Sequence, residues 1–134
     1  MNSRIKMIII CILCLLLGAA IYLLSRTDTY LNHMSYKIFR IETAMCILPT
    51  GISFYLPDFL WAAALCSGLF ALWPLGINGF IWGIITFLYG ALWELLQLFS
   101  VVKGTADLID VMLYLMAAFA VVMINYFLKT RKEK

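Results

Sequence analysis

The chain has 134 residues, of which 65% are hydrophobic and 13% are charged, and its mean hydropathy is +1.00. A water-soluble domain of this length cannot bury so much apolar surface, because small folds leave a large share of their surface in water. The net charge of +3 is small, and no basic stripe is interleaved with aromatic residues, so we expect no nucleic-acid partner. The composition predicts a single membrane domain over residues 1–134.

The first predicted span covers residues 7–24 and follows a short basic start that contains Arg4 and Lys6. Its apolar run is longer than the usual core of a signal peptide, and no convincing small-residue cleavage site follows it. We therefore expect an uncleaved helix. The CxxC motif of Cys11 and Cys14 lies inside this run, where cysteine behaves as a small hydrophobe. A metal or redox motif needs an accessible thiolate, so we expect no metal or redox site at this motif, and no cofactor is predicted for the chain.

A polar stretch over residues 25–55 follows. Within it, apolar residues at mixed three- and four-residue spacing predict an amphipathic helix on the membrane surface over residues 30–48. Pro49 and Gly51 are expected to end that helix. His33, the only histidine, is interpreted as a surface residue rather than a metal ligand.

The second span is predicted over residues 56–73, with Pro57 in the first helical turn, where its missing N–H costs nothing. The third is predicted over 77–99 and the fourth over 106–128. Four spans place both termini on one side, and the basic termini favour the cytoplasm by the positive-inside rule. The predicted fold is all-α: a four-helix transmembrane bundle of a multi-pass membrane protein with both termini cytoplasmic.

Acidic residues gather at the outer end of this predicted bundle. Glu94 lies about five residues, or roughly 7 Å, from the outer end of the third span. It shares a helix face with Gln97, as Asp107 shares one with Asp110, because residues three apart are neighbours on a helix. The third and fourth spans are joined by a short loop, so the two polar faces can meet. The predicted polar pocket consists of Glu94, Gln97, Asp110, Asp107, Asp58 and Tyr114.

Each acidic residue also has a structural interpretation. Asp58 and Asp107 are expected near helix N-termini, where the helix dipole favours a negative charge, and Thr105 is a reasonable N-cap. Glu94 is expected near a helix C-terminus, where the dipole disfavours it. An isolated carboxylate at that depth costs several kcal/mol, so its default interpretation is a functional site.

Three arrangements would neutralise Glu94. It could pair with a cation, Arg40, Arg26 or Lys103. It could share a proton with Asp110, because close carboxylates do not both ionise easily. Several oxygens could also hold a divalent cation. The sequence leaves these alternatives open.

The stretch Glu94-Leu95-Leu96-Gln97, followed by Gly104-Thr105-Ala106-Asp107-Leu108-Ile109-Asp110, resembles the VanZ-like family of small bacterial membrane proteins. That family carries a Glu and a Gln late in one helix and a D-x-x-D pair that opens the next. The upstream segment Leu56-Pro57-Asp58-Phe59-Leu60-Trp61 is similar too, so the resemblance covers about the last 80 residues.

Three places depart from the family pattern and indicate a divergent member. Members often carry Arg in the loop and Asn, then Gly, after the second Asp, whereas this chain has Gly104-Thr105, Tyr114 and Ala118. The resemblance implies a bacterial cytoplasmic membrane and a group whose named representative is associated with resistance to teicoplanin-type glycopeptides.

Three functions remain open at this point. The first is an envelope protein whose outward-facing acidic pocket binds a membrane lipid headgroup, an envelope precursor or a partner membrane protein, and so alters glycopeptide susceptibility. The second is an intramembrane lipid- or headgroup-processing enzyme that uses Glu94 and Asp110 as acid and base. The third is a small subunit or assembly factor, with Gly83, Gly90 and Ala91 allowing close helix contact. Whether the protein is an enzyme stays undecided.

Overall fold

The protein was analysed as a computed structural model, which describes residues 3–25, 37–38, 48–72, 79–103 and 105–130. Four long helices lie within these ranges: α1 (Ser3–Ser25), α3 (Thr50–Leu72), α4 (Gly79–Leu98) and α5 (Leu108–Thr130). Each is long and apolar enough to cross the hydrocarbon core of a bilayer. The chain is a multi-pass membrane protein with an all-α fold, as the composition predicts.

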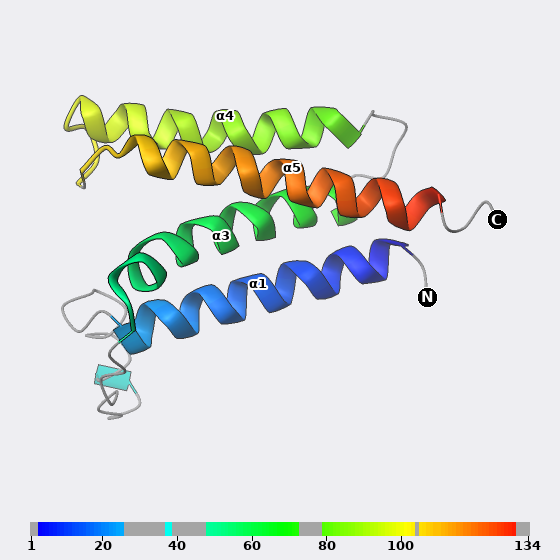
Figure 1. Cartoon of the computed structure of the whole chain (residues 1–134), viewed down its shortest axis with the longest axis horizontal. Coiled ribbons are helices and arrows are strands. Elements are labelled where there is room, and N and C mark those ends of the chain that lie inside the picture. The colour runs from blue at the N-terminus through cyan, green and yellow to red at the C-terminus, as the bar shows by residue number, and fades with distance from the viewer. Residues whose placement is uncertain (1–2, 26–36, 39–47, 73–78, 104, 131–134) are drawn as a thin grey trace.

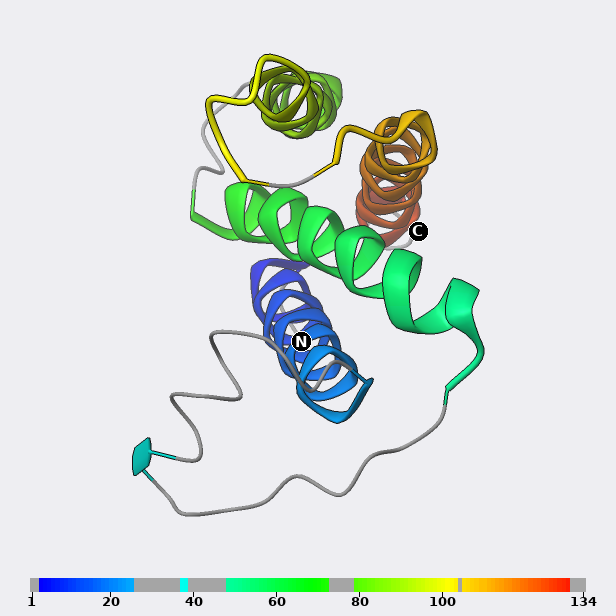
Figure 2. The same ribbon diagram turned by 90° about the vertical axis from the view of Figure 1, so that its left-hand side faces the viewer.

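Helix α3 is the central element of the bundle. In Figure 2, α1 lies on one side of α3, and α4 and α5 lie together on the other side. The packing follows this layout, since α1 contacts mainly α3, whereas α5 contacts both α3 and α4. Helix α4 contacts α3 less extensively than it contacts α5. The start of α1 and the end of α5 lie at the same end of the bundle (Figure 1), and α4 passes into α5 at the opposite end.

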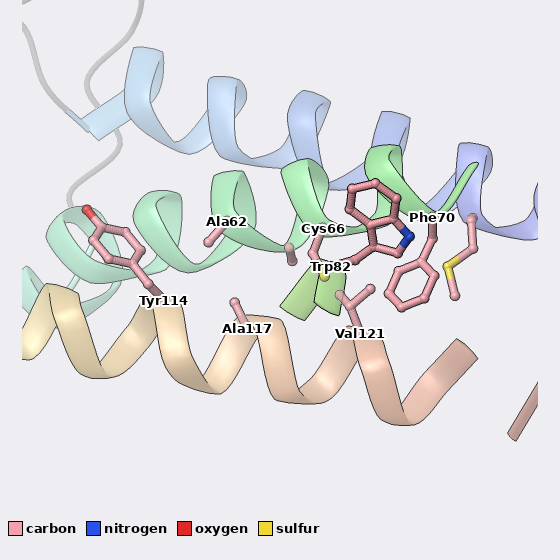
Figure 3. Packing of buried hydrophobic residues seen from close by; sticks show 9 residues of the cluster. Ala62, Cys66, Phe70, Trp82, Tyr114, Ala117 and Val121 are labelled. Carbon is pink, nitrogen blue, oxygen red and sulfur yellow. The ribbon is translucent and has the colours of Figure 1, made fainter. Parts of the chain in front are cut away.

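Small residues bring α3 and α5 close together. Ala62 and Cys66 of α3 face Ala117 and Val121 of α5 (Figure 3). Such residues allow close backbone approach, which drives helix association where lipid removes the hydrophobic incentive. The buried cluster consists of Met7, Ala62, Ala63, Cys66, Phe70, Trp82, Tyr114, Ala117 and Val121.

Glycines on α4 serve the same purpose within the bundle. A Cβ atom at Gly83 would lie 2.8 Å from Cγ2 of Val122, and one at Gly90 would lie 2.3 Å from Cδ2 of Tyr114. Both glycines therefore face α5. They explain how α4 packs in the monomer and do not point to a contact with another subunit.

Helix α3 begins earlier than predicted, at Thr50 rather than residue 56. The carbonyl oxygen of Pro49 accepts hydrogen bonds from the backbone N–H groups of Ile52 (2.9 Å) and Ser53 (3.1 Å), which starts the first turn. Pro57 is buried inside the helix, so its predicted place in the first turn is wrong. An interior proline bends a helix, and the first turns of α3 are bent in Figure 1.

The other helices start and end within a few residues of the predicted spans. The predicted surface helix over 30–48 falls mostly outside the described residues, as do His33, Arg26 and Arg40. The side of the membrane on which the helix ends lie also stays a prediction.

Candidate functional site

The turn after α4 is a Schellman motif that redirects the chain toward α5. The N–H of Val101 donates to the carbonyl of Leu96 at 2.9 Å, and the N–H of Ser100 donates to that of Gln97 at 2.9 Å. Ser100 has a φ of 57°, the left-handed conformation that this motif requires. The motif satisfies the last carbonyls of α4 and fixes where the next helix begins.

Asp107 caps the start of α5. Its Oδ1 accepts a hydrogen bond from the backbone N–H of Ile109 at 2.9 Å, and its carbonyl oxygen accepts one from the N–H of Asp110 at 3.2 Å. This is N-cap geometry, so the structural interpretation of Asp107 is confirmed. Thr105 is exposed and lies two residues before the cap, so its prediction as the N-cap is wrong.

Glu94 joins the end of α4 to the start of α5. Its side chain is only 6% exposed. Oε2 accepts a hydrogen bond from the backbone N–H of Asp107 at 3.0 Å, and Oε1 accepts one from the hydroxyl of Tyr114 at 3.1 Å. Glu94 lies near the unfavourable C-terminus of its own helix, but it faces the N-terminus of α5, where free amides and the dipole stabilise a carboxylate.

These two hydrogen bonds stabilise the Glu94 side chain by contacts that the sequence did not predict. Within the described residues, both carboxylate oxygens accept hydrogen bonds from α5. Lys103 is exposed, and pairing of Glu94 with Arg26 or Arg40 stays a prediction, because both lie outside the described ranges. Glu94 therefore holds Tyr114 and the start of α5 in place.

Gln97 extends the same connection between the helices. With its amide oriented so that both atoms are satisfied, its nitrogen donates to the carbonyl of Thr105 at 3.2 Å. Its oxygen then accepts from Nε1 of Trp93 at 3.0 Å. Gln97 thus fixes the indole of Trp93 and the linker before α5.

Two residues of α3 complete this end of the bundle. The hydroxyl of Tyr55 lies 3.5 Å from Oδ2 of Asp107. Asp58, Glu94 and Asp110 all lie within electrostatic range of the Tyr114 hydroxyl. We call this set the acidic end of the bundle; it consists of Tyr55, Asp58, Glu94, Asp107, Asp110 and Tyr114.

A cavity of about 370 Å³ adjoins the acidic end between α3 and α4. This volume lies within the range of small-molecule sites in proteins. The cavity is lined by Asp58, Trp61, Ala62, Leu65, Thr86, Tyr89, Gly90, Trp93 and Tyr114. Asp58 and Tyr114 belong to both the cavity and the acidic end, so the two form one continuous site with a mainly apolar wall.

The structure assigns different roles to the predicted pocket residues. Asp58 was interpreted as equally compatible with a helix start, but it lies more than two turns into α3 and lines the cavity. Glu94 was the strongest functional candidate, but its two oxygens hold the helices together. Among the described carboxylates, Asp58 is the one that lines the cavity.

Sequence reasoning missed Tyr55, Trp61 and Thr86. Tyr55 and Trp61 lie three residues before and after Asp58, so the helical spacing could have found them. The predicted start of the second span at residue 56 left Tyr55 outside the helix and hid that relationship.

Within the described residues, no group of three or more His, Cys, Asp or Glu side chains could hold a metal ion. Comparison of the chain with protein-family models, with curated proteins and with solved structures found no match. A functional interpretation therefore depends on the geometry of the acidic end and its cavity.

Proposed function

We propose that this protein is a VanZ-like envelope protein that binds the polar headgroup of a membrane lipid or an envelope precursor at its acidic end. In this proposal the acidic end faces outward from a bacterial cytoplasmic membrane, and both termini are cytoplasmic. The observation that supports it most directly is that Asp58, an ionisable residue within a membrane span, lines a cavity of about 370 Å³. Ionisable residues at membrane depth commonly mark ligand sites.

Contacts at the α4–α5 corner join residues of the two VanZ-like motifs. Glu94 contacts Asp107 directly, and Gln97 contacts Thr105, the residue two before Asp107. The paired motifs on the two helices therefore have a joint task, which is to hold the α4–α5 corner and present Tyr114 to the cavity. This gives a physical reason for an E-x-x-Q motif to accompany a D-x-x-D motif.

Binding at this site would act on glycopeptide susceptibility by changing access to envelope components. Glycopeptides act outside the cytoplasmic membrane, where the acidic end is proposed to lie. A protein that holds a lipid or an envelope precursor there changes how much of that molecule is exposed to the antibiotic.

The test compares glycopeptide susceptibility of a strain with the gene, without it, and with Asp58→Asn. We expect the gene to shift the inhibitory concentration and Asp58→Asn to abolish the shift. Lys129→Gln, an exposed change at the other end of α5, serves as the matched control and should behave as wild type. An unchanged profile, together with no labelled lipid or envelope precursor bound by the purified protein, overturns the proposal.

A second candidate, a headgroup-processing enzyme, is favoured by the unlike environments of two carboxyls. Glu94 is buried between α4 and α5, whereas Asp110 is only partly buried. Carboxyls in unlike environments can divide the roles of acid and base. If Glu94→Gln and Asp110→Asn both fold and keep full function in cells, this candidate fails.

A further inference from the structure

The cavity at the acidic end has the form of a short groove between two antiparallel helices. Along α3 its wall runs from Asp58 to Leu65, and along α4 it runs from Thr86 to Trp93. The ends of each stretch are seven residues apart, or about 10 Å at 1.5 Å per residue. The groove is therefore about one third as long as the hydrocarbon core of a bilayer is thick.

Small side chains keep this groove open. Ala62 and Gly90 line it, and neither fills the space between α3 and α4. The ring of Tyr114 packs against Gly90, where any Cβ atom would collide with it, and forms the inner wall with the buried Thr86. Helix α4 packs mainly against α5 and less extensively against α3, which leaves space between α3 and α4 at this position.

The rim of the groove is exposed at the surface of the bundle. Leu65 is 37% exposed, Trp93 is 41% exposed and Tyr89 is 60% exposed. Because α3 and α4 both span the membrane, a groove between them opens sideways into the lipid. A hydrocarbon chain can therefore enter from the bilayer without crossing water, and its remaining length can extend into the surrounding lipid.

Charge differs between the two ends of the groove. One end carries no charged side chain: it is lined by Leu65 and by Thr86, whose hydroxyl donates to the carbonyl of Trp82. The other end reaches Asp58, with the further carboxyls of the acidic end beside it. Carboxylates in a partly desolvated site attract a cation and repel an anion, and the effect is stronger than in water. A ligand that matches the groove has a hydrocarbon chain and a positive group at its polar end.

We infer that the groove between α3 and α4 holds one hydrocarbon chain of a membrane lipid whose headgroup carries a primary ammonium group, and that this group binds against Asp58. The inference rests on the proposed function and specifies its ligand. An ammonium has three N–H donors and no acceptor, which suits the Asp58 carboxylate and the phenol oxygens of Tyr89 and Tyr114 in the lining of the groove. The same oxygens repel an anionic headgroup that has no amine, so such a lipid should bind more weakly.

The experiment measures binding of two probes to the purified full-length chain in mild detergent. The probes are lysophosphatidylethanolamine and lysophosphatidylglycerol with the same acyl chain. The first carries an ammonium group in its headgroup, and the second carries an uncharged glycerol in its place. We expect the first to bind about tenfold more tightly, as one charge-assisted hydrogen bond in a partly buried site would give. Asp58→Asn should reduce this preference to less than about twofold, and Asp58→Glu should retain most of it.

A second pair of variants tests the position of the chain. Leu65→Trp places an indole at the uncharged end of the groove and should weaken both probes about tenfold. Leu115→Trp is the matched control, since Leu115 is 45% exposed on α5 and does not line the groove. It should leave both affinities unchanged.

The opposite outcomes are distinct. Equal binding of the two probes by the wild-type chain overturns the ammonium part, and no effect of Leu65→Trp overturns the position of the chain. Equally tight binding of O-phosphoethanolamine, which has no chain, overturns the groove as a tail site. If neither lysolipid binds but a labelled lipid-linked envelope precursor does, this inference fails while the proposed function stands. If nothing binds and the gene leaves glycopeptide susceptibility unchanged, both fail.

Discussion

The side chain of Glu94 accepts a hydrogen bond from the backbone N–H of Asp107 at 3.0 Å, so the last turn of α4 caps the first turn of α5. The same carboxylate accepts a hydrogen bond from the hydroxyl of Tyr114 at 3.1 Å, about two turns further along α5. One buried carboxylate thus fixes both the position of α5 and the direction of a side chain that lines the cavity.

Replacing Glu94 by Ala should destabilise the bundle more than replacing it by Gln. Alanine leaves the Asp107 N–H and the Tyr114 hydroxyl without their acceptor, at about 1–3 kcal/mol for each buried donor. Glutamine keeps one acceptor oxygen near the Asp107 N–H, and its NH₂ group can donate to the Tyr114 hydroxyl, so we expect about half that loss. Thermal unfolding in detergent, followed by circular dichroism, measures the difference. Equal midpoints for the two variants would show that these hydrogen bonds carry little of the stability.

Gly90→Ala should displace Tyr114 and disturb the cavity. A Cβ atom at this position would lie 2.3 Å from Cδ2 of the Tyr114 ring, on a side of the ring that cannot move without breaking its hydrogen bond to Glu94. Overpacking of this kind costs about 1–3 kcal/mol. Thermal unfolding in detergent measures the loss.

Gly51→Ala is the matched control for that variant. A Cβ atom at Gly51 would meet nothing within 4 Å, and alanine is the better helix former, so stability should stay the same or rise by up to about 1 kcal/mol. Similar midpoints for the Gly90 and Gly51 variants would contradict the packing of Tyr114 on Gly90.

The sequence predicts the four helices well, because long uncharged apolar runs have few alternatives in a membrane protein. It predicts the start of α3 poorly. Pro57 and Asp58 are typical of a helix start, but in lipid an interior proline is tolerated where neighbouring groups satisfy the freed backbone. The start is decided instead by hydrogen bonds to the carbonyl of Pro49, which no sequence pattern identifies.

The polar corner between α4 and α5 was predictable from the sequence, whereas most of the cavity wall and the role of each residue were not. Helical spacing brings Glu94, Gln97, Asp107 and Asp110 to one corner, and the short loop makes the faces meet. Which carboxylate is held by donors and which lines a cavity depends on the register of α4 against α5. That register is decided by contacts such as Gly90 against Tyr114, between residues far apart in the sequence.

Asp107→Ala should weaken the start of α5, whereas Thr105→Ala should not. Asp107 accepts the Ile109 N–H at 2.9 Å, and loss of an N-cap side chain costs about 0.5–2 kcal/mol. Asp107→Ser keeps a capping oxygen and should recover most of the loss. Thr105 is exposed, so its side chain can be removed with little effect. Thermal unfolding of the three variants checks this. A larger loss of stability for Thr105→Ala than for Asp107→Ala would show that Thr105, the residue predicted from the sequence, is the N-cap.

Ser100→Gly should stabilise the protein. Ser100 has a φ of 57°, which costs a residue with a Cβ about 1 kcal/mol but costs glycine nothing. The Schellman motif at this turn keeps its backbone hydrogen bonds in the variant. The expected rise is about 0.5–1 kcal/mol in the free energy of unfolding. Ser100→Ala keeps the strain and serves as the control, so equal stability of the Gly and Ala variants would contradict a strained turn.

Reporter fusions should reveal which side of the membrane carries the acidic end. The start of α1 and the end of α5 lie together in Figure 1, and the α4–α5 corner lies at the far end. With the basic termini in the cytoplasm, a fluorescent protein fused after Lys134 should fold and fluoresce. Alkaline phosphatase fused after Lys103, at the far end, should be active because it is exported. When the two reporters are swapped, phosphatase fused after Lys134 should be inactive and the fluorescent protein fused after Lys103 should not fluoresce. The reverse pattern would place the acidic end in the cytoplasm, where it could not meet an outward-facing headgroup, and would remove the link to glycopeptides.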